Sequence, residues 1–369
     1  MSRETQDERW MRLALNLAQR GLGCVWPNPA VGCVIVRDEK LLGRGWTQSG
    51  GRPHAETEAL AQAGDVKGAT AYVTLEPCAH HGKTPPCAEA LIAAGITRVV
   101  SALDDPDSRV AGQGYKILQD AGIEVVQDIL MDAAADLNQG FLLNRTIGRP
   151  MFTLKMASSV DGRIATASGE SRWITGPEAR RQTHLMRARH DAVLIGAGTA
   201  RIDDPLLDVR DMGLSDHNPV RIILDGGLSL SLTSRLARTA KDTPLWICHR
   251  AGLEKARRKT WEEIGVILIE VAHSDTGELD LADMAIQLGK RGLTRVLCEG
   301  GGRVASSMIA AELVDTLVTF TAGLAIGSEG GAVFGPLQID ALKDAPRFDL
   351  VESRAIGGDT MTVWKPSAR

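Results

Sequence analysis

The sequence predicts two α/β domains in one chain, and three observations lead to this expectation. The chain has 369 residues, enough for two domains of roughly 150 residues each. Short apolar, β-branched runs alternate with helix-like stretches along most of its length. This alternation breaks once, in the polar and turn-forming stretch NRTIGRP at residues 144–150. We therefore expect one domain at residues 1–146 and a second at residues 147–369.

The elements of the first domain follow from hydrophobic spacing. Helices are predicted where apolar residues recur at helical spacing before a glycine: residues 8–20, 54–64, 87–95 and around 114–122. Strands are predicted at short apolar runs: residues 31–36, 69–75 and 97–103. Helices and strands in this order are typical of a layered α/β domain.

The second domain repeats the alternation. Its strands are predicted in the runs MFTLKMA, DAVLIGAG, PVRIILDG, TPLWICH, GVILIEV, TRVLCEGGG and DTLVTFTA. At residues 294–313 a strand, a run of glycines and a helix follow one another. Such a junction presents backbone N–H groups to an anion, so we interpret it as a phosphate site. A turn that only lets helix and strand pack closely is the alternative, and the G-x-G-x-x-G pattern of a Rossmann fold is absent.

Composition excludes several classes of function. The net charge is −4 and aromatic residues make up 4% of the chain, which argues against a broad nucleic-acid-binding surface. The first residues, MSRETQDERWMRLALNLAQRG, are not typical of a signal peptide. No stretch approaches the roughly 18 apolar residues of a membrane span. We expect a cytoplasmic protein with no membrane or nucleic-acid partner, whose six cysteines are buried thiols or metal ligands.

Two motifs together contain the residue types that a catalytic zinc ion needs as ligands. The stretch EPCAHHGKTPPC contains Cys78 and Cys87, and the upstream PHAE contains His54. Three protein ligands and an open position for water are typical of such a site. Glu56 lies two residues after His54, a spacing that does not share a face inside a helix. Both must therefore lie where the helix begins, and Pro53 suits that position.

The pattern H-x-E, then P-C and a second cysteine, is typical of zinc-dependent nucleobase deaminases. Zinc lowers the pKa of bound water from about 16 to about 7, and a carboxylate that is not a ligand, here Glu56, carries the protons. The alternatives are a structural zinc site that recruits His80 or His81, and a disulfide between Cys78 and Cys87. A zinc-stabilised binding module is a further rival, but it leaves Glu56 unexplained. A nucleic-acid-editing deaminase would have two residues between its cysteines, whereas residues 79–86 intervene here.

EPCAHHGKTPPC, WPNPAVGCVIV and GRPHAE resemble the bifunctional pyrimidine deaminase/uracil reductases of riboflavin biosynthesis. The resemblance implies an N-terminal cytidine-deaminase-like three-layer domain. It also implies that Asn28, His80 and Lys83 bind the substrate. Asn28 can hydrogen-bond a ring amide, and Lys83 can meet a 5′-phosphate. A turn-stabilising asparagine between two prolines and a solvated lysine are the alternatives.

The resemblance continues through FTLKMASSVDGRIATASGESRWITG, RIDDPLLDVR and CEGGGRVASSMI, and so covers nearly the whole chain. It implies a C-terminal reductase domain with a dihydrofolate-reductase-like fold that uses NADPH. The substrate contacts that it implies, with Lys155 added as a candidate near the sugar, are Lys155, Ser171, Arg187, Leu207, Arg210 and Glu299. The cofactor contacts that it implies are Ala157, Trp173, Thr199, Asp203, Gly226, Gly301, Gly302, Arg303, Val304, Ala305, Ser306 and Ser307.

Arg187 and Arg210 fit a clamp on the sugar phosphate, because guanidinium forks match phosphate oxygens. Trp173 fits a core residue as well as a cofactor contact. Three positions depart from the family, of which Ala200, where valine is usual, is minor. Gly226 stands where serine is frequent, so a side-chain hydrogen bond is lost there. Asp208 stands where threonine is familiar and can pair with Arg210, which would weaken its phosphate contact.

The resemblance implies two reactions. The first is hydrolytic deamination of 2,5-diamino-6-ribosylamino-4(3H)-pyrimidinone 5′-phosphate. The second is NADPH-dependent reduction of the ribosyl chain of 5-amino-6-ribosylamino-uracil 5′-phosphate to ribityl. It also implies a homo-oligomer, a dimer or a tetramer.

Overall fold

The computed structural model describes residues 4–79, 85–106, 111–214 and 217–367. The chain divides into two compact units, Met1–Gly148 and Arg149–Arg369. The sequence placed this boundary after residue 146. Among the described residues, no helix combines the length and the hydrophobicity that crossing a membrane requires.

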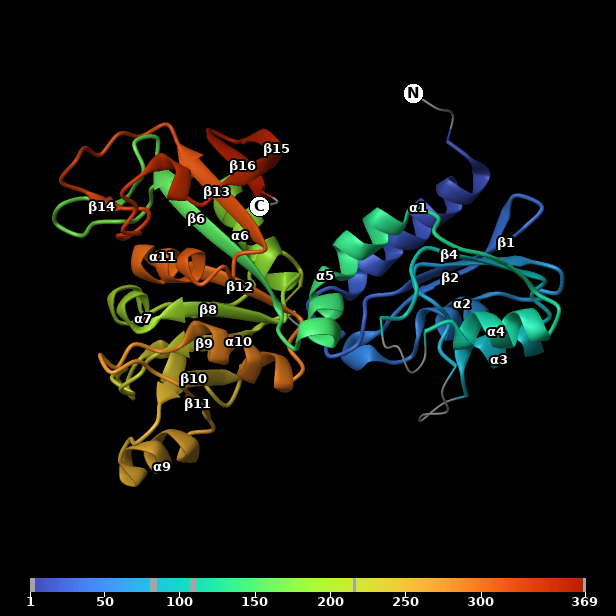
Figure 1. Ribbon diagram of the computed structural model, residues 1–369, viewed down its shortest axis with the longest axis horizontal. Helices are drawn as coiled ribbons and strands as arrows, with labels where there is room; N and C mark the ends of the chain where they lie inside the picture. The colour runs from blue at the N-terminus through green and yellow to red at the C-terminus, as the bar shows by residue number, and fades with distance from the viewer. Residues whose placement is uncertain (1–3, 80–84, 107–110, 215–216, 368–369) are drawn as a thin grey trace. The chain divides into compact units, whose positions relative to one another are not determined.

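The first unit is a three-layer sandwich with a five-stranded sheet in the middle (Figure 1). Its helices are α1 (Gln6–Ala18), α2 (Ala55–Gln62), α3 (Cys87–Ala93), α4 (Gln113–Asp120) and α5 (Met131–Ile147). Its strands are β1 (Gly32–Arg37), β2 (Lys40–Trp46), β3 (Thr70–Val73), β4 (Arg98–Ser101) and β5 (Glu124–Val126). The strand order is β2-β1-β3-β4-β5, and β3, β4 and β5 run parallel.

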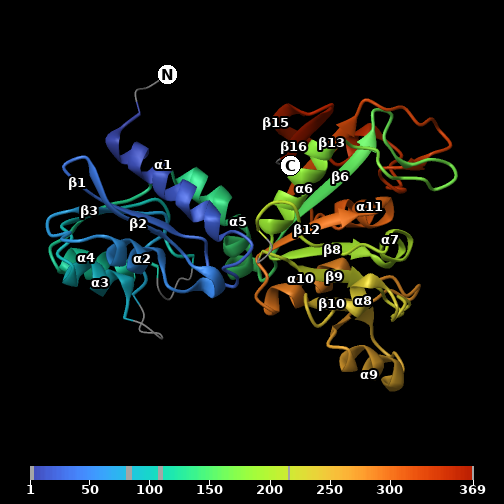
Figure 2. The same cartoon turned by 180° about the vertical axis from the view of Figure 1, so that it is seen from behind.

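Two hydrophobic clusters fix the layers of this unit. Met11 and Ala14 of α1 pack with Val34 of β1 on one face, together with α5. Cys33 and Ile35, the alternate residues of β1, pack on the other face against α2, α3 and α4. Because side chains alternate along a strand, one β1 sequence serves both cores. The two helical layers lie on opposite sides of the sheet in Figures 1 and 2.

The second unit has a nine-stranded sheet of order β11-β10-β9-β8-β12-β6-β13-β16-β15, and a small two-stranded sheet β14-β7. Its strands are β6 (Met151–Ser159), β7 (Arg163–Ala165), β8 (Ala192–Gly196), β9 (Val220–Leu224), β10 (Leu245–Arg250), β11 (Ile267–Val271), β12 (Arg295–Gly300), β13 (Thr316–Ala322), β14 (Gly331–Ala332), β15 (Phe348–Ile356) and β16 (Asp359–Pro366). Its helices are α6 (Pro177–Ala188), α7 (Ala197–Asp203), α8 (Arg235–Arg238), α9 (Lys255–Glu263), α10 (Leu281–Lys290) and α11 (Gly302–Ala310).

The parallel part of this sheet has a point where its strand order reverses. From β8 the chain adds β9, β10 and β11 on one side, whereas β12 and β6 lie on the other. A crevice at the carboxyl ends of the strands is expected at such a switch point, and ligands bind there in open α/β sheets. All five residues of β8 are buried, because helices cover both faces of the sheet.

Several elements of the structure were not predicted from the sequence. β2 has polar and glycine residues at most positions, and β15 is exposed along nearly all its length, so neither shows an apolar run. α5 was not predicted, and residues 144–147, interpreted as part of a linker, form its last turn. Gly148 ends this helix in the left-handed conformation (φ 75°), which is the role that glycine has at many helix ends.

Candidate active sites

The three predicted metal ligands of the first unit come together. His54 is the N-cap of α2, Cys87 begins α3, and Cys78 follows β3. The Nδ1 atom of His54 lies 3.3 Å from the sulfur of Cys87 and 3.6 Å from that of Cys78. All three ligand atoms lie within 4.8 Å of one another. This group is the one set of clustered ligand residues found in the described part of the chain.

The chemistry of these donors fits zinc. The thiol and the backbone N–H of Cys87 donate to the sulfur of Cys78, the latter at 3.2 Å, and this lowers the pKa of Cys78 to about 4. The same thiol contact and burial raise the pKa of Cys87. These contacts favour the thiolate form of Cys78, and metal binding would release the proton of the second cysteine. Two sulfurs and one imidazole leave a tetrahedral ion one open position.

Glu56 lies in the first turn of α2 and is only 4% exposed. Burial, and after it the negative charge of Cys78, raises the pKa of its carboxyl to about 7. A carboxyl with such a pKa can both take up and release a proton near neutral pH. His54 and Glu56 therefore both lie at the N-terminal end of α2, as their separation of two residues predicted.

The other predicted residues of this site are only partly described. Asn28 lies in the loop before β1. Its side chain packs directly against Gly51, where an added Cβ would stand 1.9 Å from Asn28 Nδ2. His80 and Lys83 lie outside the described residues, as does His81. Cys78 and Cys87 are both thiols and form no disulfide with each other.

Sequence reasoning missed Glu76, which is 5% exposed and stands two residues before Cys78. Its carboxylate accepts from the backbone N–H groups of Asp105, Gly112 and Gly114 at 3.2, 3.0 and 2.8 Å. It thereby ties the end of β3 to the start of α4. A carboxylate next to a ligand cysteine was visible in the sequence, but its partners, 29 to 38 residues away, were not.

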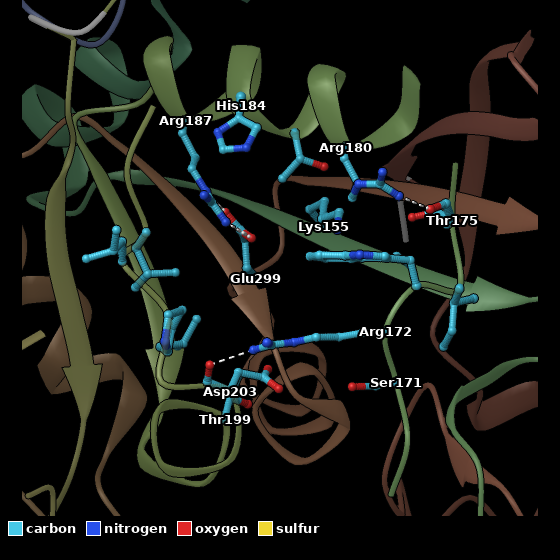
Figure 3. Close-up of a pocket in the computed structure, with 18 of the residues that line it drawn as sticks. Lys155, Ser171, Arg172, Thr175, Arg180, His184, Arg187, Thr199, Asp203 and Glu299 are labelled. Carbon is cyan, nitrogen blue, oxygen red and sulfur yellow. Dashed lines mark hydrogen bonds and ion pairs between the residues drawn. The ribbon is translucent and has the colours of Figure 1, made fainter. Parts of the chain in front are cut away.

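In the second unit, the predicted residues surround a cavity of about 720 Å³. It opens at the switch point, where Ile195 of β8, Glu299 of β12 and Ala157 of β6 contribute to the wall. The predicted residues that line it are Lys155, Ala157, Ser171, Trp173, Arg187, Thr199, Asp203, Leu207, Arg210 and Glu299. Figure 3 shows Arg180, His184 and Arg187 pointing into this space from one helix, α6.

An ion pair crosses the floor of the cavity. Arg187 donates from Nε and Nη2 to the two oxygens of Glu299, at 2.5 and 2.8 Å, and from Nη1 to the carbonyl of Asp208 at 3.0 Å. Lys155 stands beside this pair, and burial lowers the pKa of its ammonium group although the charge of Glu299 opposes the shift. In Figure 3 it lies between Glu299 and Arg180.

These contacts limit the predicted clamp of Arg187 and Arg210 on a sugar phosphate. Three N–H groups of Arg187 are already used within the protein, so Arg187 has only its remaining N–H groups for a phosphate. Arg210 pairs with Asp208 at 2.8 Å, as its sequence neighbour suggested, and its side chain is 49% exposed. The two arginines therefore do not form a free pair of forks.

Trp173 is not a core residue, since it is 66% exposed. The guanidinium of Arg180 lies 4.6 Å from its ring centroid and that of Arg172 lies 5.9 Å away. Arg172 also donates to the carbonyl of Asp203 at 2.6 Å. Sequence reasoning passed over Arg172, Arg180 and His184, because arginine and histidine on a helix or loop are more often solvent-facing than part of a site.

The glycine run lies at the edge of the cavity. Gly301 has φ 83°, and an added Cβ there would stand 2.6 Å from Thr199 Oγ1. Ala305 is the first residue of α11 whose N–H bonds back into the helix, to Gly301, so the preceding N–H groups have no partner within the helix. This arrangement fits a phosphate group.

The remaining predicted cofactor contacts are less direct. Ala305 and Ser306 are buried, and the hydroxyl of Ser306 donates to the carbonyls of Gly302 and Gly335. Arg303 is exposed and pairs with Glu278 at 3.1 Å. The residues that do not line the cavity are Gly226, Gly301, Gly302, Arg303, Val304, Ala305, Ser306 and Ser307.

Comparison with known proteins agrees with both sites. Residues 4–103 match the family model of the cytidine and deoxycytidylate deaminase zinc-binding region, and residues 150–362 match the RibD C-terminal domain. The riboflavin biosynthesis protein RibD of Escherichia coli is 42% identical over 96% of this chain and 98% of its own length. That of Haemophilus influenzae is 40% identical over 98% of each.

Solved structures agree along the whole chain. Acinetobacter baumannii RibD is 40% identical, covers 98% of this chain and 99% of its own, and superposes with a TM-score of 0.88. A Thermotoga maritima protein described as a diaminohydroxyphosphoribosylaminopyrimidine deaminase/5-amino-6-(5-phosphoribosylamino)uracil reductase is 33% identical, with the same coverage and a TM-score of 0.84.

The fold and the two sites define a bifunctional enzyme that combines a zinc-dependent deaminase with a reductase. The chain belongs to the RibD family of riboflavin biosynthesis.

Proposed function

We propose that residues 1–146 deaminate 2,5-diamino-6-ribosylamino-4(3H)-pyrimidinone 5′-phosphate. Residues 147–369 then reduce the ribosyl chain of 5-amino-6-ribosylamino-uracil 5′-phosphate to ribityl. The description of the Thermotoga maritima relative as a deaminase/reductase of these compounds supports the assignment. The observation that carries the deaminase assignment is the convergence of three ligand atoms within 4.8 Å beside the buried Glu56.

In the deaminase site, His54, Cys78 and Cys87 hold zinc, and Glu56 is the catalytic residue. Zinc supplies a Lewis acid that lowers the pKa of water. Glu56 takes one proton from the attacking water and passes it to the ring nitrogen. It then carries the second proton, from the hydroxyl group added to the ring carbon, to the amine, which leaves as ammonia. Its pKa of about 7 suits both transfers. Asn28, His80 and Lys83 bind the ring and the phosphate of the substrate.

In the reductase site, Arg187 pairs with Glu299 at the floor of the cavity, and the negative charge of Glu299 attracts the neighbouring ammonium group of Lys155. Lys155 is placed to give a proton to the sugar oxygen as the ribose ring opens, since burial lowers the pKa of its ammonium group and so makes it a better acid. Ser171, Leu207 and Arg210 complete the sugar-phosphate contacts. Reduction needs an opened sugar chain, and a cavity of about 720 Å³ has room for it.

NADPH is the proposed cofactor and supplies the hydride. Thr199 and the N–H groups at the start of α11 bind its pyrophosphate, because they lie together at the switch point. Trp173, Ala157 and Asp203 line the neighbouring wall of the cavity. The further proposed contacts are Gly226, Gly301, Gly302, Arg303, Val304, Ala305, Ser306 and Ser307.

We also propose that the enzyme acts in the cytoplasm on phosphorylated pyrimidines and assembles as a dimer or tetramer. The absence of a candidate membrane span among the described helices is compatible with this location. Light scattering on the purified chain tests the assembly.

The function is tested with the whole chain and two assays. Purified protein should contain about one zinc per chain and release ammonia from the diaminopyrimidine substrate. Oxidation of NADPH should require the deaminated product. Glu56→Gln should keep zinc and reductase activity but lose ammonia release by more than hundredfold. Glu58→Gln, two residues further along α2, is the matched control and should behave like the parent. Near-native deamination by Glu56→Gln would exclude the proposed role.

A further inference from the structure

α5 contains a buried amide that the two reactions do not use. Asn138 is 3% exposed, in the middle of the helix. Its neighbours on the same helix face, Ala134 and Phe141, belong to the two hydrophobic clusters of the first unit. A polar side chain in such a place is costly unless it is hydrogen-bonded. The hydrogen-bond partners of Asn138 therefore indicate the role of this buried side chain.

Both partners belong to one residue. The Oδ1 atom of Asn138 accepts from the N–H of Ala30 at 3.0 Å, and its Nδ2 donates to the carbonyl of Ala30 at 3.1 Å. The amide thus pairs with Ala30 as the backbone of a neighbouring strand would. Ala30 is itself 3% exposed, so without Asn138 its N–H and C=O would be buried and unpaired.

Ala30 belongs to the loop WPNPA that carries Asn28, the proposed substrate contact. Other hydrogen bonds fix the two ends of this loop. Asn28 N–H donates to the carbonyl of Val25 at 3.0 Å, and Val31 N–H donates to Thr47 Oγ1 at 2.9 Å. Between these two hydrogen bonds, the backbone N–H and C=O of Ala30 have their partner in α5, a helix that begins more than 100 residues later.

This helix lies outside both family matches. The deaminase model matches residues 4–103 and the reductase model matches residues 150–362, whereas α5 spans Met131–Ile147. Neither match assigns α5 a role. Its one fully buried polar side chain reaches back to the substrate loop of the deaminase site.

We propose that Asn138 is a positioning residue of the deaminase site: through Ala30 it holds the WPNPA loop so that Asn28 meets the substrate. The inference rests on the proposed deaminase function and on the role of Asn28 in it. It makes α5 part of the deaminase rather than a connector. Because Asn28 contacts substrate and not the reacting carbon, loss of Asn138 should weaken binding and spare the chemical step.

The test compares Asn138→Ala, Asn138→Asp and the control Gln139→Ala in the full-length zinc-loaded enzyme. Alanine favours helix and leaves α5 intact. We expect Asn138→Ala to raise the KM for deamination about tenfold, or about 1.4 kcal/mol, with kcat within about twofold. Asn138→Asp keeps the acceptor for the Ala30 N–H but opposes its carbonyl, so its KM should also rise. Gln139→Ala should leave KM unchanged.

Three further readouts separate positioning from a purely structural role. The zinc content and the reductase activity of the same chain should not change in either Asn138 variant. Hydrogen exchange at the Ala30 amide should be slow in the parent, as for β1, and at least tenfold faster in Asn138→Ala. The parent measurement needs no variant, so it holds even if a substitution prevents folding.

The outcomes decide as follows. A higher KM with faster exchange at Ala30 supports the proposal. An unchanged KM despite faster exchange overturns it, and so does an equal fall in deaminase activity, reductase activity and zinc content. An Ala30 amide that exchanges like an exposed loop in the parent also overturns it. If the parent itself releases no ammonia, the proposed function fails instead, and the two failures are distinct.

Discussion

Arg187 and Glu299 lie 112 residues apart in the sequence and meet in a two-bond ion pair, with N···O distances of 2.5 and 2.8 Å. Their side chains are only 12% and 11% exposed. Removing one partner of such a buried pair leaves an uncompensated charge, at a cost of about 3–5 kcal/mol. The pair therefore organises the reductase cavity, with Lys155 as its third charged member.

Glu299→Gln should lower the kcat/KM of reduction by more than hundredfold, because it leaves Arg187 and Lys155 without their counter-charge. Ammonia release by the same chain should stay near the parent rate. Glu263→Gln is the control: its partner Lys259 is 71% exposed, and exposed pairs contribute about 0–1 kcal/mol. Equal effects of the two substitutions on NADPH oxidation would contradict the prediction.

Cys78→Ser should reduce bound zinc from about one per chain to almost none after dialysis, because a hydroxyl is a poor replacement for a thiolate ligand. Elemental analysis measures this directly. Cys24→Ser should retain the metal, since Cys24 is half-buried and outside the ligand cluster. Full zinc retention by Cys78→Ser would move the site elsewhere.

Gly301→Ala should weaken NADPH binding about tenfold or more, because its Cβ would stand 2.6 Å from Thr199 Oγ1 at the proposed phosphate site. Gly252→Ala separates this effect from backbone strain. Gly252 also has positive φ, 75°, but an added Cβ meets nothing within 4 Å. Titration of NADPH by fluorescence compares the variants, and equal affinities would argue against a cofactor site at Gly301.

His190 should make the second unit less stable in mild acid. Burial and the nearby charge of Arg295 lower its pKa from 6.5 to about 3, so the folded state stays unprotonated while the unfolded state takes up a proton. Stability is thus lost as pH falls below about 6.5. Between pH 7 and pH 5 the free energy of unfolding should fall about 2 kcal/mol more in the parent than in His190→Asn. Urea unfolding at both pH values measures the difference, and parallel pH dependences would refute the assignment.

Local sequence was sufficient for much of this protein. A strand such as β8 is a continuous apolar run because helices cover both faces of the sheet, and such a run is visible without a structure. The metal ligands were also readable, since His54 and Glu56 stand together at a helix entry and Cys87 begins the next helix after Cys78. The pairing of Asp208 with Arg210 needed only a separation of two residues.

Elements without a local pattern were missed. α5 has the sequence MDAAADLNQGFLLNRTI, in which a polar residue, Asn138, occupies a buried position and a glycine follows it. β15 has almost no buried side chain, so no alternation of apolar and polar residues marks it. In both cases the element is stabilised by partners elsewhere in the chain, which a local window does not contain.

The sequence by itself determined the fold class and predicted which three side chains cluster as candidate zinc ligands beside a candidate catalytic carboxylate, because spacing within short motifs fixes where those side chains go. Only the tertiary structure decided which charges meet. It paired Arg187 with Glu299, placed Lys155 beside them and joined Asn138 to Ala30 across 108 residues. These contacts depend on how sheets and helices pack, and packing is set by the whole core rather than by any one stretch of chain.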